Sequence, residues 1–251
     1  MAADIEQGLV QHLIELRARL IRALLCVLLI FIALSFFAND LYSYAARPLI
    51  ENLSAGNNMI ATQVASTFLV PLKLAFFIAL VISMPYLLYQ VWAFIAPGLY
   101  ENEKKLAIPL LISSILLFYT GFAFAYFLIF PIMFAFFTHA APQGVHVMTD
   151  ISHYLDFIMK LLFAFGLAFE VPVLTFMLTR TGIISIESLQ SKRPYIIVAA
   201  FTLGMLLTPP DVLSQVLLAV PLCLLFEVGL LMSKKLGVQA TATQEQEKSG
   251  Q

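Results

Sequence analysis

The sequence predicts an all-α membrane protein that crosses a bilayer several times. Of its 251 residues, 61% are hydrophobic and only 12% are Asp, Glu, Lys or Arg, against roughly 25% charged residues in an average soluble domain. The apolar residues gather in long stretches that polar segments separate, and about 20 apolar residues are enough for a helix to cross a bilayer. These observations predict six transmembrane helices in a single domain, residues 1–235.

The first predicted span covers residues 20–38 and follows Arg17, Arg19 and Arg22. Its 19 residues extend roughly 28 Å as a helix, close to the bilayer core of about 30 Å. The stretch is longer than the apolar core of a cleaved secretion signal, so we expect a retained helix. The polar, turn-forming connection that follows, residues 39–67, is expected outside the membrane.

Three further spans are predicted in the middle of the chain. Residues 68–95 end in aromatic side chains typical of a membrane interface, and Pro85 is expected to kink this helix. Residues 106–137 contain no charged side chain, and their length of roughly 48 Å as a helix implies tilt or projection beyond the lipid. The fourth apolar segment covers residues 154–179.

The last two predicted spans are less regular. Residues 195–208 number 14, about 21 Å as a helix, so a crossing requires local thinning of the bilayer. The final apolar segment ends at Met232. A re-entrant hairpin would leave Lys234 on the same side of the membrane, and this alternative stays open. The tail, residues 236–251, has no apolar period and is expected to be disordered.

The basic residues predict the orientation, because Lys and Arg concentrate in cytoplasmic segments. Eleven of the fourteen fall on the side of the N-terminus. They are Arg17, Arg19, Arg22, Lys104, Lys105, Arg180, Lys192, Arg193, Lys234, Lys235 and Lys248. Only Arg47, Lys73 and Lys160 fall towards the other side. Both termini are therefore predicted to be cytoplasmic, in the inner membrane of a bacterium.

Composition and motifs argue against several functions. The formal net charge of −1 argues against nucleic-acid binding, which needs clustered Lys and Arg. The chain has no zinc-protease motif, phosphate-binding loop, nucleophile elbow or dinucleotide turn, so we expect no catalytic residue, metal or cofactor. His139, His146 and His153 recur every seven residues. Pro142 and Gly144 would interrupt a helix there, so we interpret these histidines as loop residues.

Two acidic residues lie in or beside apolar segments. Glu170 lies in the middle of the fourth segment, where an ionised carboxylate is costly unless it is paired or hydrated. It is either a functional residue or a neutral, hydrogen-bonded acid that holds helices together. Asp211 follows two prolines and precedes an apolar helix, so its structural role would be an N-cap.

Two acidic sites lie on the predicted cytoplasmic side. In residues 12–19, Glu15 stands four residues before Arg19, which predicts an ion pair on one face of a helix. The second site is the short loop that contains Glu101 and Glu103. The structural interpretation of the first site is a surface helix with one ion pair. Without further information, the second is interpreted equally well as a solvated turn.

Five short motifs follow one another along the chain: HLIELRAR at 12–19, FIAPGLYENE at 94–103, FEVPV at 169–173, KRPY at 192–195 and LTPPD at 207–211. In sequence and order they resemble the TatC family, the multi-spanning subunit of the Sec-independent twin-arginine translocase. The similarity runs from about residue 10 to residue 235.

The resemblance implies six helices arranged as a concave cup that binds folded precursors through their twin-arginine signal peptides. It also implies single-span TatA-type and TatB-type partner subunits, self-association within a receptor complex, and transport driven by the proton-motive force in a lipid membrane. By the same resemblance, Glu15 and Glu103 are the signal-recognition carboxylates. Further roles are implied for Arg17, Phe94, Glu170 and Asp211.

Thr208 and Gln215 are expected to dock the single-span partners, because a thinned region would expose their polar side chains. Two other classes of function are weighed against the translocase. An ion-coupled small-molecule transporter is suggested by Glu170 and Lys160 within apolar segments. An intramembrane enzyme would require a nucleophile or metal constellation that the sequence lacks.

Overall fold

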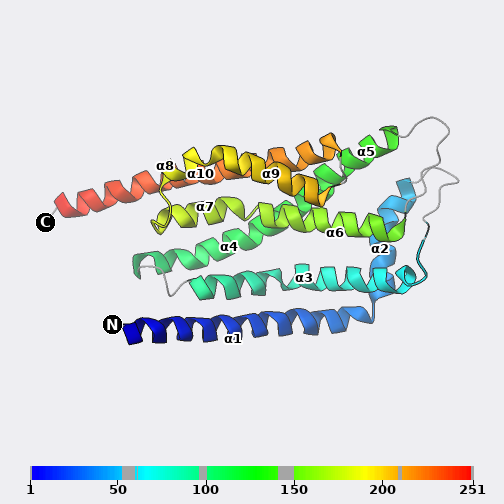
Figure 1. The fold of residues 1–251 in the computed structure, drawn as a ribbon, viewed down its shortest axis with the longest axis horizontal. Helices are drawn as coiled ribbons and strands as arrows, with labels where there is room; N and C mark the ends of the chain where they lie inside the picture. The colour runs from blue at the N-terminus through cyan, green and yellow to red at the C-terminus, as the bar shows by residue number, and fades with distance from the viewer. Residues whose placement is uncertain are drawn as a thin grey trace. The chain divides into compact units, whose positions relative to one another are not determined.

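The computed structural model is all-helical (Figure 1). It describes the backbone of residues 2–52, 60, 62–95, 101–140, 150–208 and 211–249, and the side chains of residues 11–45, 60, 62–95, 107–136, 150–208 and 211–235. The helices are α1 (Ala2–Ser35), α2 (Ala38–Asn52), α3 (Ser66–Ile95), α4 (Glu101–Phe124), η2 (Ala125–Ile129), α5 (Phe130–Ala140), α6 (Ile151–Ala168), α7 (Val171–Arg180), α8 (Ile186–Ser191), α9 (Arg193–Leu207) and α10 (Val212–Ser249).

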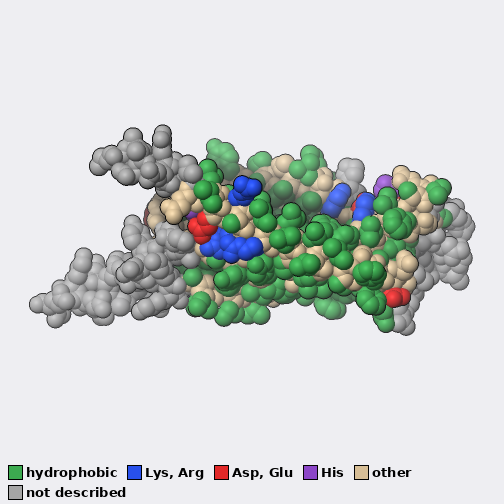
Figure 2. Space-filling view, turned by 90° about the horizontal axis from the view of Figure 1, so that it is seen from below, with side chains coloured by type: hydrophobic (Ala, Val, Ile, Leu, Met, Phe, Trp, Pro, Cys, Tyr) green, Lys and Arg blue, Asp and Glu red, His purple; other side chains and the backbone are tan. Residues whose placement is uncertain are grey.

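Five helical segments in the described part of the chain are long and apolar enough to cross a membrane. They are Gln11–Ser35, Ser66–Ile95, Ala107–Phe136, Ile151–Arg180 and Val212–Lys235. A sixth apolar helix, α9, has 15 residues, or about 22 Å against a bilayer core of about 30 Å. Hydrophobic side chains dominate the face seen in Figure 2, as expected of a surface that meets lipid. The all-helical, multi-spanning class is confirmed, and α9 is as short as the sequence predicts.

The helices form two compact units, Met1–Ile115 with Ala140–Met159, and Leu116–His139 with Lys160–Gln251. In the first unit, α1 and α2 pack against α3. Phe31 of α1 meets Phe76 of α3 edge to face, with ring centroids 5.5 Å apart. The buried Trp92 indole donates to the Ser114 hydroxyl at 3.2 Å and thereby ties α3 to α4.

The connection after the first span is more ordered than the sequence suggested. Residues 38–52 form α2, with Asp40 in its first turn, where the helix dipole favours a carboxylate. Further on, the Ile60 carbonyl accepts from the Ile151 N–H at 3.1 Å, so this connection is attached to the start of α6. α3 then continues without interruption through Pro85 to Ile95.

The third predicted span carries a π-helical segment, η2. At its end the Phe130 N–H bonds to the Ala125 carbonyl, five residues back instead of four. The next residue is Pro131, which has no N–H and cannot continue the regular ladder. A wider turn accommodates such a defect without ending the helix, which explains why one apolar run contains α4, η2 and α5.

The fourth predicted span is broken at Glu170. The Glu170 N–H bonds to Leu167 O at 3.0 Å, three residues back, and the Glu170 carbonyl then accepts from the Leu174 N–H at 2.9 Å. Pro172 lacks an N–H and its ring excludes the carbonyl four residues earlier. The chain therefore ends α6 at Ala168 and restarts as α7 at Val171.

In the second unit, α10 packs against α7, α8 and α9. Phe226 and Leu230 of α10 form a buried cluster with Leu189 of α8. At Gly229 the backbones come close, since an added Cβ would lie 2.8 Å from Pro172 Cα. Gly182, at φ +70°, ends α7 in a left-handed conformation that glycine adopts without strain.

The C-terminal tail and the domain division remain predictions. The backbone of α10 is helical to Ser249, but the side chains beyond Lys235 lie outside those described, so the expected disorder of residues 236–251 is not tested. The two compact units likewise do not decide whether residues 1–235 act as one domain.

Candidate functional site

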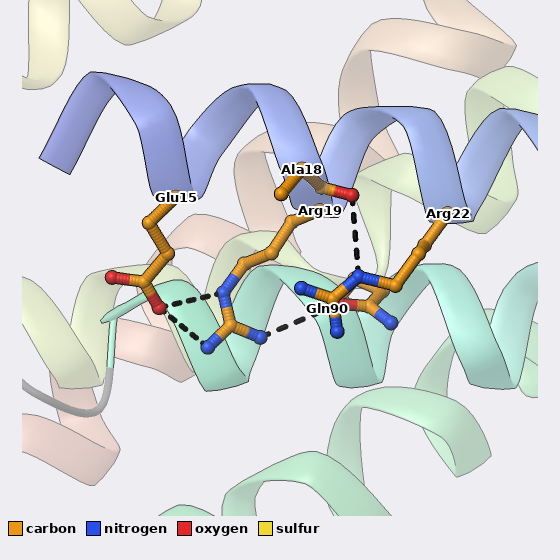
Figure 3. Close-up of polar contacts among 5 residues, drawn as sticks. All are labelled: Glu15, Ala18, Arg19, Arg22 and Gln90. Carbon is orange, nitrogen blue, oxygen red and sulfur yellow. Dashed lines mark hydrogen bonds and ion pairs between the residues drawn. The ribbon is translucent and has the colours of Figure 1, made fainter. Parts of the chain in front are cut away.

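The N-terminal motif forms a charged cluster with α3 (Figure 3). Arg19 donates from Nε and Nη2 to the same Glu15 oxygen, Oε1, at 2.9 and 2.6 Å. Its third nitrogen, Nη1, lies 3.3 Å from the side-chain oxygen of Gln90 on α3. The sequence-predicted pair of Glu15 and Arg19 is therefore confirmed, and a residue 71 positions away joins it.

Burial makes this cluster more than a solvated surface pair. The side chains of Arg19 and Glu15 are 18% and 34% exposed, and Gln90 is buried. Partial desolvation strengthens charge-assisted hydrogen bonds relative to those in water. Arg22 lies one turn further along α1, is exposed, and bonds only to the Ala18 carbonyl among the contacts in Figure 3, at 3.2 Å.

An aromatic pair continues the same contact towards the N-terminus. His12 of α1 stacks on Phe94 of α3 with ring centroids 4.2 Å apart and planes 19° apart. His12, Glu15 and Arg19 are spaced three and four residues apart and so share one face of α1. Opposite them, Gln90 and Phe94 lie one turn apart on α3. A stripe of α1 and a stripe of α3 thus meet side by side.

The other predicted signal-binding residues are placed less completely. Glu103 lies in the first turn of α4, but its side chain is outside those described. Figure 1 shows the end of α3, the start of α4 and the N-terminus of α1 at the same end of the first unit. Arg17 is exposed on α1, and because it is two residues from Arg19 it lies on a different face of the helix.

Glu170 occupies the break between α6 and α7 and is buried. The helices around this break pack closely within the second unit. An added Cβ at Gly121 of α4 would lie 2.5 Å from the Phe165 carbonyl oxygen and 2.8 Å from the Phe169 ring. The buried position and the close packing are compatible with a functional Glu170 and with a neutral, hydrogen-bonded acid that holds the helices together, so both interpretations stay open.

Asp211 is the N-cap of α10, as its sequence context suggested. Its Oδ1 accepts from the Ser214 N–H at 2.7 Å, which satisfies one of the free N–H groups at the start of the helix. The other carboxylate oxygen, Oδ2, is buried, as is the Ser214 hydroxyl. A structural role for Asp211 is therefore confirmed, and a functional role stays a prediction.

The expected exposure of Thr208 is wrong. Thr208 is buried and donates its hydroxyl to the Gly204 carbonyl at 2.8 Å. Gln215 is half-buried and donates Nε2 to the Phe201 carbonyl at 2.9 Å. Because α9 and α10 fold against each other, each helix covers polar groups of the other that an isolated short span would expose. A docking role for the two residues is a separate question and stays a prediction.

The structure brings only part of the predicted set together. Glu15, Phe94 and the backbone of Glu103 belong to the first unit, whereas Glu170, Thr208, Asp211 and Gln215 belong to the second. Of the predicted loop histidines, His139 falls in α5 and His153 in α6, and His146 is outside the described residues.

Two contributors to the cluster at Glu15 were missed from sequence. Gln90 is a lone amide within the second apolar segment, and such a buried polar side chain requires a partner. The sequence therefore indicated that Gln90 needs a hydrogen-bond partner, but it did not indicate that the partner is Arg19. His12 belongs to the N-terminal motif, yet only its stacking on Phe94 shows what it contacts.

Comparisons with known proteins agree with the family that the sequence motifs resemble. A family model described as Sec-independent protein translocase protein (TatC) matches residues 11–221. The Sec-independent protein translocase protein TatC of Haemophilus influenzae is 56% identical over 231 residues, covering 92% of this chain and 90% of the relative. The protein of the same name from Escherichia coli K12 is 54% identical over 234 residues, covering 93% and 91%.

A solved structure is also similar. It is described as a crystal structure of the twin-arginine translocase receptor TatC, and it is 36% identical in sequence. It superimposes with a TM-score of 0.81 and covers 89% of this chain and 98% of its own.

Proposed function

The chain belongs to the TatC family, the receptor subunits of the twin-arginine translocase, and from this we propose that Glu15 and Glu103 bind the two arginines of the signal peptide. As a family member it is a multi-pass membrane protein of the bacterial Tat system and a transport protein without enzymatic activity. This decides against an intramembrane enzyme and against a small-molecule transporter.

The observation that carries the proposal is the guanidinium group already bound at Glu15. Arg19 places two N–H donors on this carboxylate within 2.9 Å, so the site has the shape and partial burial that a guanidinium group requires. Arginine presents several donors in a rigid plane, whereas lysine presents one compact charge. A carboxylate in this setting therefore favours twin-arginine over twin-lysine peptides.

Two successive arginines require two carboxylates. Glu103 is the second candidate because its helix starts in the same unit as α1 and α3. The Trp92–Ser114 hydrogen bond, 3.2 Å long and buried, supports a stable position of α4 against α3. The two acids are proposed to converge on the cytoplasmic surface of the membrane.

The test is signal-peptide binding to Glu15→Gln, Glu103→Gln and the double variant, each as the full chain in lipid nanodiscs. Each charge-assisted bond contributes roughly 1.5 to 3 kcal/mol, so each single change should weaken binding by about one to two orders of magnitude. Glu6→Gln on α1 and Glu101→Gln beside Glu103 are matched controls that remove an acid nearby. Near-native binding by the double variant, with arginine still preferred over lysine, would place the pocket elsewhere.

The finer topology is also a proposal. Six crossings with both termini in the cytoplasm are supported by the eleven basic residues on one predicted side and by six apolar helical segments. Their arrangement as a concave cup is proposed from the family resemblance alone. In this arrangement the chain would act with TatA-type and TatB-type subunits, associate with further copies of itself, and use the proton-motive force to export folded precursors.

The proposed docking place for the single-span subunits is the hairpin of α9 and α10. The short α9 implies a thinned region, and there a partner's polar side chain would have to displace the Phe201 carbonyl from Gln215 and the Gly204 carbonyl from the buried Thr208. Thr208→Val with Gln215→Leu should reduce crosslinks to these partners more than it lowers thermal stability. Thr202→Val is the matched control, because Thr202 is exposed on α9 and bonds within its own helix to Val198 at 2.8 Å. Unchanged crosslinks in the double variant would remove this docking place.

A further inference from the structure

The Glu15 carboxylate proposed to receive a signal arginine is occupied by an arginine of the same chain. Both recorded bonds from Arg19 fall on Oε1, at 2.9 and 2.6 Å. Among the described residues no donor is recorded for Oε2. An incoming guanidinium group would therefore meet a half-occupied carboxylate and a like charge beside it.

The same arginine has a second acceptor. Arg19 Nη1 lies 3.3 Å from the buried Gln90 oxygen (Figure 3). This acceptor is neutral and sits on another helix, so its bond does not depend on the bonds to Glu15. If Arg19 leaves Glu15, Gln90 can still hold its guanidinium group, which keeps a half-buried cation from losing every partner.

We propose that Arg19 is an internal competitor for the signal peptide at Glu15 and that Gln90 holds Arg19 when the signal arginine displaces it. Binding is then an exchange of one guanidinium group for another. The inference rests on the proposed function, because it needs Glu15 to be a signal-binding carboxylate. It adds that Arg19 occupies part of the carboxylate by default, and that Arg19 and Gln90 set how often the whole carboxylate is open to the peptide.

The expected change in peptide affinity follows from the fraction of molecules in which Arg19 has left Glu15, the open form of the site. A ligand that binds only the open form has its apparent affinity reduced by the open fraction. Helical ion pairs contribute up to about 1 kcal/mol, which corresponds to about a two- to fivefold change in a binding constant. Arg19→Gln should therefore tighten binding of a twin-arginine peptide by about two- to fivefold.

The matched control is Arg22→Gln. It removes the same charge from the same helix one turn away, but Arg22 bonds to a backbone carbonyl and not to Glu15 in Figure 3. The general effect of one less positive charge near a cationic peptide appears in both variants. The excess tightening of Arg19→Gln over Arg22→Gln measures competition at the carboxylate.

Changes at Gln90 should act in opposite directions. Gln90→Glu offers Arg19 a second carboxylate, opens Glu15 and tightens peptide binding. Gln90→Leu removes the alternative acceptor, holds Arg19 on Glu15 and weakens binding by a similar factor. A residue that merely supports the fold would lower binding in both variants.

The experiment measures binding of a synthetic peptide with two consecutive arginines and an apolar segment, and of its twin-lysine form, to the full chain in lipid nanodiscs. A pure competitor changes both affinities by the same factor, so the ratio between the peptides should stay constant in Arg19→Gln. Weaker binding in Arg19→Gln, equal effects of Arg19→Gln and Arg22→Gln, or a changed ratio would each overturn the inference. Loss of the Glu15→Gln effect would instead overturn the proposed function, so the two failures are distinguishable.

Discussion

Arg193, the first residue of α9, and Glu227, on α10, form a two-point ion pair within the second unit. Arg193 Nε lies 2.7 Å from Oε1 of Glu227, and Nη2 lies 2.7 Å from Oε2. Such a parallel arrangement uses the planar guanidinium group fully, and lysine cannot reproduce it. The pair fixes the start of the short helix against the long one.

Loss of this pair should loosen the start of α9 with little effect on global stability. The side chains are 46% and 41% exposed, so solvent screening limits the contribution to about 0.5 kcal/mol. We expect Arg193→Lys to speed amide hydrogen exchange in the first turns of α9. Because salt screens the native ion pair, the difference in exchange rate between the variant and the native chain should be smaller at high salt. Lys192→Gln, at the preceding exposed residue, should leave exchange unchanged, and an equal effect there would contradict a specific role for the pair.

Gly229 should tolerate no larger residue. An alanine Cβ would lie 2.8 Å from Pro172 Cα and 2.9 Å from Thr175 Cβ, and backbone atoms cannot move aside as a flexible side chain does. Overpacking of this kind costs about 1 to 3 kcal/mol, so thermal unfolding in detergent should shift clearly downwards for Gly229→Ala. Gly204→Ala is the milder comparison, because its new Cβ would lie no closer than 3.1 Å to Gln215 Cγ and 3.2 Å to the Gln215 carbonyl oxygen, distances that a shift of a few tenths of an ångström relieves. Equal destabilisation by the two changes would argue against a tight α7–α10 contact.

Asp150 should make the attachment of Thr62 to the start of α6 sensitive to acid. Its Oδ2 accepts from the Thr62 hydroxyl and N–H, at 2.5 and 3.0 Å, and its Oδ1 accepts from the Ser152 and His153 N–H groups. These bonds, those from Thr62 foremost, hold the pKa of Asp150 well below its ordinary value of 3.8. A depressed pKa means that the stabilisation is present above the ordinary value and is lost as the pH falls below it.

Protection of the Thr62 amide from hydrogen exchange should therefore be constant from neutral pH to about pH 4 and fall at lower pH. In Asp150→Asn the protection should be weaker throughout and show no such fall, because the amide does not titrate. Thr62→Val, which removes only the hydroxyl, should retain the pH dependence in a weaker form. Constant protection of the Thr62 amide in the native chain well below pH 4 would show that the Asp150 carboxylate does not hold Thr62 in place.

The turn between α9 and α10 should be reachable from outside the cytoplasm. Asp211 caps α10, so a cysteine there would disturb the helix, whereas Val212 is 77% exposed and makes a better probe. In a background without Cys26 and Cys223, Val212→Cys should react with an impermeant thiol reagent in intact cells. Glu187→Cys, on the predicted cytoplasmic side, should react only after the membrane is opened. Protection of Val212→Cys in intact cells, with labelling from the cytoplasmic face, would favour the re-entrant hairpin.

The sequence by itself determined the features that depend on neighbours along the chain. Apolar stretches of bilayer length predicted the spans, and the four-residue spacing predicted the pair of Glu15 and Arg19. The break at Glu170 was not predicted, although Pro172 beside it explains it once the structure is known. The motifs also identified the family. The spans and the ion pair follow from helical geometry, which depends on residues close together along the chain.

Only the tertiary structure decided which distant residues complete these features. Gln90 joins Arg19 from 71 positions away, Glu227 joins Arg193 from 34 positions away, and Thr208 is buried where exposure was expected. In a chain this apolar, almost any helix face is able to pack against another, so composition does not single out a partner. Partners are selected where polar groups must be satisfied and where backbones approach closely, and both conditions arise only once the helices have packed.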